Sequence, residues 1–162
     1  DELAVAQRSG TLYRNFQGYS THADCDLIGI GSTSIGQVGD CYAQNLKELD
    51  SYYETIDSGH LPVYRGVELD EDDKLRREVI TQLICHFTLE KAKVEKAWSI
   101  NFNDYFATEL NDLAEIEKDG LVSLSADRID VQPAGKLLIR NICMVFDRYL
   151  REKQNQRFSK VI

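Results

Sequence analysis

The glycine-rich stretch over residues 29–39 is the part of the sequence best suited to hold a ligand. It follows a short apolar run at residues 26–30, which predicts a buried strand. Glycine lets a backbone approach a ligand closely because it has no side chain. Neither nucleotide-binding pattern is met, since Ser34 stands where the dinucleotide motif needs glycine and Gln37 where the phosphate loop needs lysine. A structural turn and the edge of a cofactor site are therefore equally good interpretations.

Metal-binding patterns are missing from the sequence. The four cysteines stand at positions 25, 41, 85 and 143, too far apart for a zinc or iron–sulfur binding loop. Cys85 and Cys143 lie in apolar runs, which predicts buried, reduced thiols. The histidines lack metal-ligand spacing, and the acidic residues 68 and 70–73 are better explained as favourable charge at a helix N-terminus than as a calcium loop. We predict no metal site in this chain.

Composition narrows the class of protein. The chain has 162 residues, 43% of them hydrophobic, with no run long enough to span a membrane and no signal peptide pattern, so we expect a cytoplasmic protein. The net charge of -8 argues against a nucleic-acid binder. From Pro133 to the end, however, the sequence has seven Lys and Arg residues and only two acidic ones. This basic segment is open to three interpretations: a solvated helix face, a nucleic-acid contact, or the wall of a pocket for an anionic ligand.

The first sixty-odd residues predict strand and loop with one helix. Residues 12–19 are aromatic and extended, and Asn45 is expected to cap a helix that ends at Gly59. A strand, a glycine loop and a helix form one α/β element, which cannot bury its own strand on both faces. Residues 1–66 are therefore expected to be the last segment of a larger α/β structure.

From residue 67 to residue 162 the pattern becomes helical. Apolar residues at i, i+4, i+8 and i+12 predict a long first helix opened by Asp70; they are Leu75, Val79, Leu83 and Phe87. Thr88 is expected to cap a second helix, and a third ends near Gly120. Residues 121–132 alternate and predict a hairpin, the only sheet expected in this half. Pro133 then opens one long helix to about Lys153.

These patterns together predict a fold that is mainly α with a small β component. Three helices, a hairpin and a closing helix resemble a winged-helix arrangement with an extra C-terminal helix. At this point the separated motifs, taken in order, closely resemble the C-terminal part of bacterial oxygen-independent coproporphyrinogen III oxidase. The motifs are Tyr13-Arg-Asn-Phe-Gln-Gly-Tyr19, Asp26-Leu-Ile-Gly-Ile-Gly-Ser-Thr-Ser-Ile-Gly36, Gly39-Asp-Cys-Tyr-Ala-Gln-Asn45, Arg76-Arg-Glu-Val-Ile80, Leu137-Leu-Ile-Arg-Asn-Ile-Cys-Met-Val-Phe-Asp147 and the terminus Phe158-Ser-Lys-Val-Ile162.

The resemblance implies a radical S-adenosylmethionine (SAM) enzyme of haem biosynthesis. Such an enzyme uses a [4Fe-4S] cluster, held by C-x-x-x-C-x-x-C, to cleave S-adenosylmethionine and decarboxylate two propionates of coproporphyrinogen III, giving protoporphyrinogen IX. That motif is absent here, so residues 1–66 would be a truncated terminal segment of the radical-SAM (βα) barrel. We expect this chain alone to carry no catalytic residue, to bind neither the cluster nor S-adenosylmethionine tightly, and to be inactive. The parent enzyme is expected to be a monomer.

The resemblance also implies particular site residues. Ile35 matches a family position that contacts one S-adenosylmethionine, and Phe16 and Gln17 match a stretch near a second. A glycine loop after a barrel strand is where ligands bind in α/β barrels. Because buried carboxylates must be paired, a substrate with four propionates needs cationic partners. Arg14 and Arg140 are our candidates for those partners.

Two other functions stay open. The first is a related radical-SAM haem chaperone, which transfers haem, although the Arg14-Asn-Phe-Gln-Gly-Tyr19 stretch favours the oxidase. The second is an isolated winged-helix module that binds nucleic acid or protein, which the acidic net charge disfavours. We expect neither a nucleic-acid nor a membrane partner.

Overall fold

A computed structural model describes the backbone of residues 1–158 and the side chains of residues 1–153. The last four residues of the Phe158-Ser-Lys-Val-Ile162 motif lie outside this described part. The chain divides into two compact units. Unit 2 is Tyr13–Lys74, and unit 1 joins Asp1–Leu12 to Leu75–Ile162. Among the described residues, no helix is both long and apolar enough to cross a lipid bilayer.

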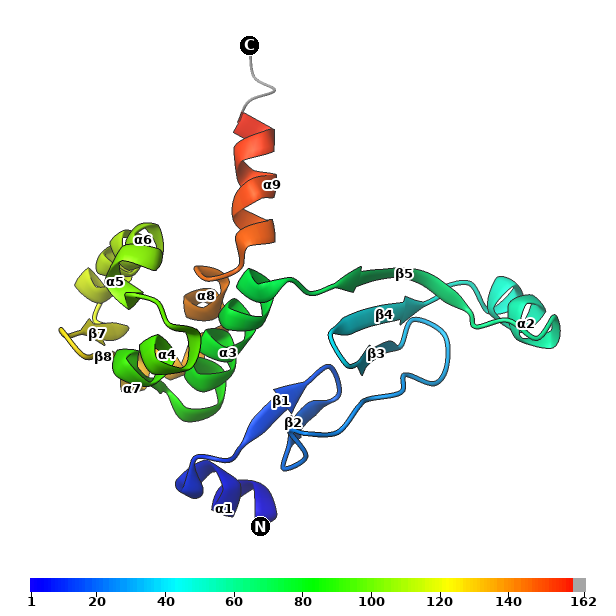
Figure 1. The fold of residues 1–162 in the computed structure, drawn as a ribbon, viewed down its shortest axis with the longest axis horizontal. Helices are drawn as coiled ribbons and strands as arrows, with labels where there is room; N and C mark the ends of the chain where they lie inside the picture. Colours follow the sequence, from blue (N-terminus) through cyan, green and yellow to red (C-terminus); the bar gives the residue numbers. More distant parts are fainter. Residues whose placement is uncertain (159–162) are drawn as a thin grey trace. The chain divides into compact units, whose positions relative to one another are not determined.

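Unit 2 is built from two small antiparallel sheets and a helix. Strands β1 (Tyr13–Asn15) and β2 (Gly18–Ser20) form a tight hairpin. Strands β3 (Ile35–Val38), β4 (Cys41–Asn45) and β5 (Val63–Glu68) lie side by side in that order (Figure 1). Helix α2 (Leu49–Asp57) connects β4 to β5. The extended character expected for residues 12–19 is thus confirmed.

Two local predictions for unit 2 are wrong. Residues 26–30 form no strand, because their ladder is limited to a single antiparallel bridge between Leu27 and Gln37. Asn45 is no helix cap either: it ends β4, and α2 begins only at Leu49. The polar side chain that suggested a cap is used instead to hold the glycine loop, as described below.

Unit 2 buries few apolar side chains. Of its large apolar residues in the described structure, only Tyr52 and Leu69 are buried, each 8% exposed. Ile30 and Leu61 are 86% and 84% exposed, and every residue of β5 is exposed. A three-stranded sheet with so little covering cannot draw its stability from its own core.

Unit 1 is helical around one small sheet. Its helices are α1 (Glu2–Ser9), α3 (Glu71–His86, whose first turn lies in unit 2), α4 (Lys91–Trp98), α5 (Phe102–Tyr105), α6 (Ala107–Lys118), α7 (Pro133–Leu137), α8 (Ile139–Met144) and α9 (Arg148–Phe158). The apolar stripe predicted for α3 is confirmed for Leu75, Val79 and Leu83, which are at most 2% exposed. It is wrong for Phe87, because α3 ends at His86 and Phe87 has a φ of 60°. The three confirmed residues pack in one core with the fully buried rings of Phe102, Phe106 and Phe146. Unit 1 therefore has the hydrophobic core that unit 2 lacks.

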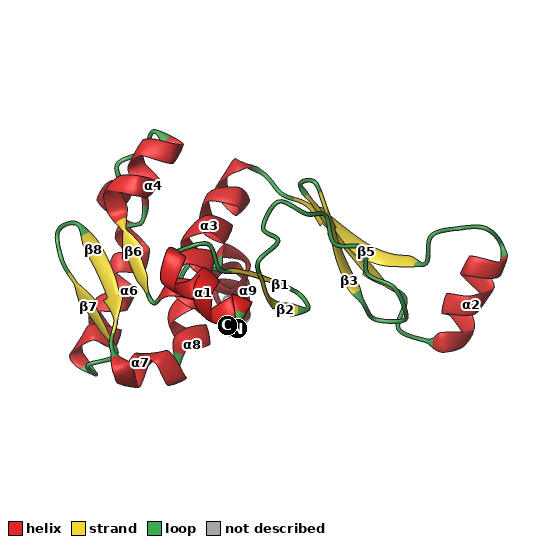
Figure 2. Ribbon diagram, turned by 90° about the horizontal axis from the view of Figure 1, so that it is seen from below, coloured by secondary structure: helices red, strands yellow, loops and turns green. Residues whose placement is uncertain are grey.

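The sheet of unit 1 has three strands. The predicted hairpin is confirmed as β7 (Val122–Leu124) and β8 (Arg128–Val131). The prediction that this hairpin is the only sheet component is wrong, because residues 88–90 form β6 (Thr88–Glu90), which pairs with β8. Figure 2 shows β6, β8 and β7 side by side.

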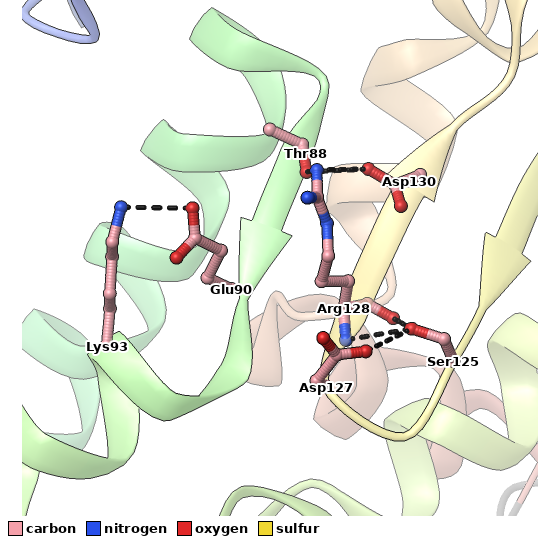
Figure 3. A network of polar contacts seen from close by, with 7 residues as sticks. All are labelled: Thr88, Glu90, Lys93, Ser125, Asp127, Arg128 and Asp130. Atoms are coloured by element: carbon pink, nitrogen blue, oxygen red, sulfur yellow. Dashed lines mark hydrogen bonds and ion pairs between the residues drawn. The ribbon is translucent and has the colours of Figure 1, made fainter.

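A polar network explains why Thr88 joins the sheet instead of capping a helix (Figure 3). The Thr88 hydroxyl donates to Asp130 Oδ1 at 2.7 Å. Arg128 Nη2 donates to Thr88 Oγ1 at 3.0 Å and to Asp130 Oδ1 at 3.1 Å. The partners of Thr88 are about forty residues away in the sequence, so this pairing leaves no local signal.

The single long helix predicted from Pro133 is also wrong. The segment breaks at Leu138, whose φ of -110° and ψ of 20° lie outside the helical range, and again between Met144 and Arg148. Asp147 starts α9, because its Oδ1 accepts hydrogen bonds from the backbone N–H groups of Tyr149 and Leu150 at 3.0 and 3.1 Å. These bonds satisfy helix-end donors, as in any N-cap.

Lys91, the first residue of α4, is 6% exposed and carries its ammonium group into unit 1. Nζ donates to the Ser125 carbonyl at 2.8 Å and to Asn103 Oδ1 at 3.0 Å. The side chain thus ties the β7–β8 turn to α4 and α5.

We expect Lys91→Ala to lower the free energy of unfolding by about 1–3 kcal/mol, because it leaves partly buried acceptors without a donor. Lys93→Ala is the matched control on the same helix, where an exposed ion pair to Glu90 at 3.0 Å contributes about 0.5 kcal/mol or less. Urea unfolding followed by the fluorescence of Trp98, the one tryptophan of the chain, measures both. Equal losses in the two variants would contradict this role.

Candidate ligand-binding site

The β1–β2 hairpin carries three of the residues predicted to bind ligands. Phe16 and Gln17 form its turn, where Asn15 Oδ1 accepts from the N–H groups of Gln17 and Gly18 at 2.9 and 3.2 Å. Gly18 has a φ of 135°, which favours glycine. Both turn side chains are exposed, so the sequence folds this hairpin locally and leaves them free to contact a ligand.

Aromatic contacts fix the directions of the hairpin side chains. The Phe16 ring meets the ring of Tyr42 edge-on, with centroids 5.0 Å apart. Tyr42 lies on β4 opposite Gln37 of β3, so Phe16 is attached to the same sheet that begins with Ile35. The Arg14 guanidinium lies 5.6 Å from the centre of the Tyr19 ring across the hairpin. Phe16, Gln17, Arg14 and Ile35 therefore all belong to unit 2.

Two side chains, Asn45 and Tyr52, hold the start of the glycine loop before Ile35. Asn45 Nδ2 donates to the carbonyls of Gly29 and Gly31 at 3.0 Å each, and to Ser34 Oγ at 3.1 Å. The Tyr52 hydroxyl of α2 accepts from the Gly31 N–H at 3.0 Å. The loop is thus pinned from both β4 and α2.

Close backbone contacts explain why two positions of this segment are glycine. A Cβ on Gly36 would lie 2.8 Å from the Leu27 carbonyl oxygen, and one on Gly29 would lie 2.9 Å from the Ile35 carbonyl carbon. These two glycines let the loop and β3 backbones touch. The structural interpretation therefore accounts for the glycine pattern, and a cofactor role must rest on other grounds.

Arg140 lies in the other unit. It is exposed on α8, beside the exposed Leu137 and Leu138. Nearby, Lys136 Nζ lies 4.8 Å from the centre of the Phe87 ring. A cavity of about 230 Å³ involves α6, α8 and α9, but none of the predicted site residues lines it; its walls are Asp112, Asn141, Met144, Val145, Leu150 and Arg151.

The cysteines do not form a metal centre in the described part of the chain. Cys85 and Cys143 are buried in the core of unit 1, as predicted, and Cys25 and Cys41 are exposed in unit 2. No group of three His, Cys, Asp or Glu side chains is placed to hold a metal ion within residues 1–153. The donor set of this chain therefore does not fit an iron–sulfur cluster.

The acidic run before α3 is used for helix capping. Asp70 Oδ1 accepts from the Asp73 N–H at 2.8 Å, and Asp73 Oδ2 accepts from the Asp70 N–H at 3.2 Å. The pKa of Lys74 is raised, because its ammonium group donates hydrogen bonds to the carboxylates of Glu71 and Asp40, with Glu71 the larger cause. The helix N-terminus interpretation is confirmed.

The sequence pattern missed the residues that shape the loop. Asn45 was predicted to cap a helix, and neither Tyr42 nor Tyr52 was among the predicted site residues. Their contacts join positions 11 to 26 residues apart across strands and a helix, which no local spacing predicts.

With this geometry in view, comparison with known proteins gives the class. Residues 69–138 match the family model described as the HemN C-terminal domain. A solved structure described as "Coproporphyrinogen III oxidase (HemN) from Escherichia coli is a Radical SAM enzyme" superposes with a TM-score of 0.86 and 53% identity, covering 92% of this chain and 34% of that one.

Curated relatives agree. The oxygen-independent coproporphyrinogen III oxidase of Escherichia coli (strain K12) is 55% identical over 163 residues, covering 100% of this chain and 36% of that protein. The enzyme of the same name from Pseudomonas aeruginosa is 50% identical over 162 residues, covering 100% and 35%. The chain spans about a third of the length of these relatives. The resemblance of the chain to the C-terminal part of oxygen-independent coproporphyrinogen III oxidase is confirmed.

Proposed function

We propose that this chain is the C-terminal part of a radical S-adenosylmethionine enzyme that oxidatively decarboxylates two propionates of coproporphyrinogen III to give protoporphyrinogen IX in the cytoplasm. The observation that carries the proposal is identity of 55% over the whole chain with an oxidase of that name. Proteins this similar in sequence seldom differ in activity, whereas a shared fold alone would not assign one.

Two structural features support the architecture that goes with this proposal. Strands β1 to β5 lie in unit 2, whose exposed apolar residues suit a remnant of the radical-SAM barrel that packs against the rest of a longer protein. In unit 1, α3 is followed by β6, by the three helices α4, α5 and α6, and by the β7–β8 hairpin. This order, with the strand order β6-β8-β7, suits a winged-helix-like domain.

The ligand roles are proposed from the family resemblance, and the side chains of unit 2 suit them. A cluster held by the rest of the longer protein would supply the electron that cleaves S-adenosylmethionine. The exposed Phe16 ring, braced by Tyr42, and the Gln17 amide suit a second S-adenosylmethionine, while Ile35 gives apolar contact to the first. Arg14 and Arg140 are proposed partners for substrate propionates, because a guanidinium pairs a carboxylate with two hydrogen bonds.

This chain alone is expected to carry no [4Fe-4S] cluster. Its cysteines lack the C-x-x-x-C-x-x-C spacing, and two of them are buried apart from the others in unit 1. Iron analysis after anaerobic reconstitution should give no tightly bound iron, whereas about four irons per chain would contradict the proposal.

A chimera tests the function. In it, this chain replaces the aligned 163 residues of the Escherichia coli enzyme. With the cluster loaded, we expect S-adenosylmethionine cleavage that depends on coproporphyrinogen III. A haem chaperone, the second candidate, would bind haem and show no dependence on the porphyrinogen. Haem binding with no dependence on the porphyrinogen would favour the haem chaperone.

A further inference from the structure

We infer that Asn45 is a positioning residue for S-adenosylmethionine: its side-chain amide holds the loop 29–34, and with it Ile35, in the shape that receives the ligand. This inference rests on the proposed function and adds to it a residue that touches the loop and not the ligand. It differs from the predicted contacts of Ile35, Phe16 and Gln17, which concern the ligand directly.

The contacts of Asn45 converge on both ends of the loop. One amide nitrogen serves three oxygens, on Gly29, Gly31 and Ser34, at 3.0 to 3.1 Å. Ser34 Oγ also donates to the Gly31 carbonyl at 2.7 Å. The amide has two hydrogens, so one of them is shared between acceptors.

Backbone bonds hold the residues on either side of Gly29 and Gly31. Before them, Leu27 and Gln37 exchange two backbone hydrogen bonds at 2.7 and 2.8 Å. Thr33 donates to the Leu46 carbonyl at 2.9 Å, and the Asn45 N–H donates to the Ser34 carbonyl at 2.9 Å. These bonds hold the end of the loop that joins β3. The start of the loop, at Gly29 and Gly31, is held by the side chains of Asn45 and Tyr52.

The shape held in this way displays apolar side chains. Ile28 and Ile30, on either side of Gly29, are 68% and 86% exposed, and Ile35 follows at the start of β3. Exposed isoleucines on a pinned loop keep a fixed apolar surface, so little conformational entropy is lost when a ligand covers it. A loosened loop would lose that advantage and bind more weakly.

Asn45→Asp tests the inference in the cluster-loaded chimera. The carboxylate has the size of the amide but no hydrogen to donate, and it would face the carbonyl oxygens of Gly29 and Gly31. We expect the dissociation constant of S-adenosylmethionine, measured by equilibrium dialysis, to rise about tenfold, in line with the loss of buried hydrogen bonds. Amide exchange at Gly31 should quicken, while iron content and kcat at saturating S-adenosylmethionine stay within about twofold.

Gln44→Ala is the matched control. Gln44 precedes Asn45 on β4 and donates one exposed hydrogen bond to the Thr33 carbonyl at 3.2 Å. We expect its dissociation constant to stay within about twofold of the unsubstituted chimera. If Asn45→Asp prevents folding, Tyr52→Phe, which removes only the acceptor of the Gly31 N–H, decides in its place with an expected rise of about threefold.

The outcomes separate the two proposals. An unchanged dissociation constant in Asn45→Asp, with faster exchange at Gly31, overturns the positioning role and leaves the proposed function standing. An equal rise in Gln44→Ala also overturns it, since any change on β4 would then suffice. If the unsubstituted chimera holds its cluster but binds no S-adenosylmethionine, the proposed function fails and the positioning role fails with it.

Discussion

Glu109→Ala is expected to lower the free energy of unfolding of unit 1 by about 3–5 kcal/mol. Glu109 lies on α6 with a side chain only 6% exposed, and its Oε1 accepts from Arg76 Nη1 at 2.8 Å. Arg76, on α3, also donates to the Phe146 carbonyl at 3.1 Å and lies 5.4 Å from the centre of the Phe106 ring. Removing the carboxylate takes a close ion-pair partner away from a guanidinium whose side chain is only 15% exposed.

Two controls make this prediction specific. Glu109→Gln keeps an acceptor for Arg76 and should lose less, about 1–3 kcal/mol. Glu115→Ala, on the same helix, removes an ion pair to Lys118 whose side chains are 73% and 69% exposed, and should change stability by no more than about 0.5 kcal/mol. Urea unfolding followed by Trp98 fluorescence measures all three. If Glu109→Ala lowers the free energy of unfolding as little as Glu115→Ala does, the Arg76–Glu109 pair is no stronger than an exposed ion pair, and the prediction is contradicted.

Gly135→Ala is the second substitution with a large expected effect, about 3 kcal/mol of lost stability. Gly135 is buried in α7, and a Cβ there would lie 2.0 Å from the Leu121 carbonyl oxygen and 3.1 Å from Val131 Cγ1. The same carbonyl accepts from the Gln132 N–H at 2.9 Å, so the helix and the hairpin cannot separate without losing that bond.

Ala134→Ser is the control for Gly135→Ala. Ala134 is the preceding residue of α7 and is exposed, so we expect a change within about 0.5 kcal/mol. Amide exchange at Val122 and Val131 should quicken in Gly135→Ala only. Equal stability of the two variants in urea would show that α7 does not pack against the hairpin as closely as the structure indicates.

Local patterns predicted the parts of the fold that depend on neighbours in the sequence. The stripe that begins at Leu75 predicted α3, because side chains four residues apart share a helix face. Alternation over residues 121–132 predicted the β7–β8 hairpin. The acidic residues at Asp70 and Asp73 predicted the start of α3 and were found as its reciprocal caps.

Elements decided by distant partners could not be predicted in this way. Thr88 has the residue type of a cap, yet its strand exists because β8 offers it a ladder about forty residues on. The second break in the helix after Pro133 follows from Asp147, which caps α9. Asp147 alone gave a local signal, an aspartate before a helical run, that could have been used.

The same distinction between local and long-range contacts applies to the candidate site. Residues 12–19 were predicted to be extended, but neither the turn at Phe16 and Gln17 nor its attachment to Tyr42 was predicted. The glycine loop was recognised, whereas its support by Asn45 depends on how β4 returns beside it. Arg14 and Arg140 lie in different units, and their shared role rests on the chemistry of the substrate.

The most direct test of the proposed function is the mass of the porphyrinogen that the cluster-loaded chimera forms from coproporphyrinogen III. We predict a product that has lost two carboxyl groups as carbon dioxide and carries two vinyl groups, formed only when S-adenosylmethionine is present. Recovery of unchanged coproporphyrinogen III, from a chimera that holds its cluster and binds S-adenosylmethionine, would contradict the account.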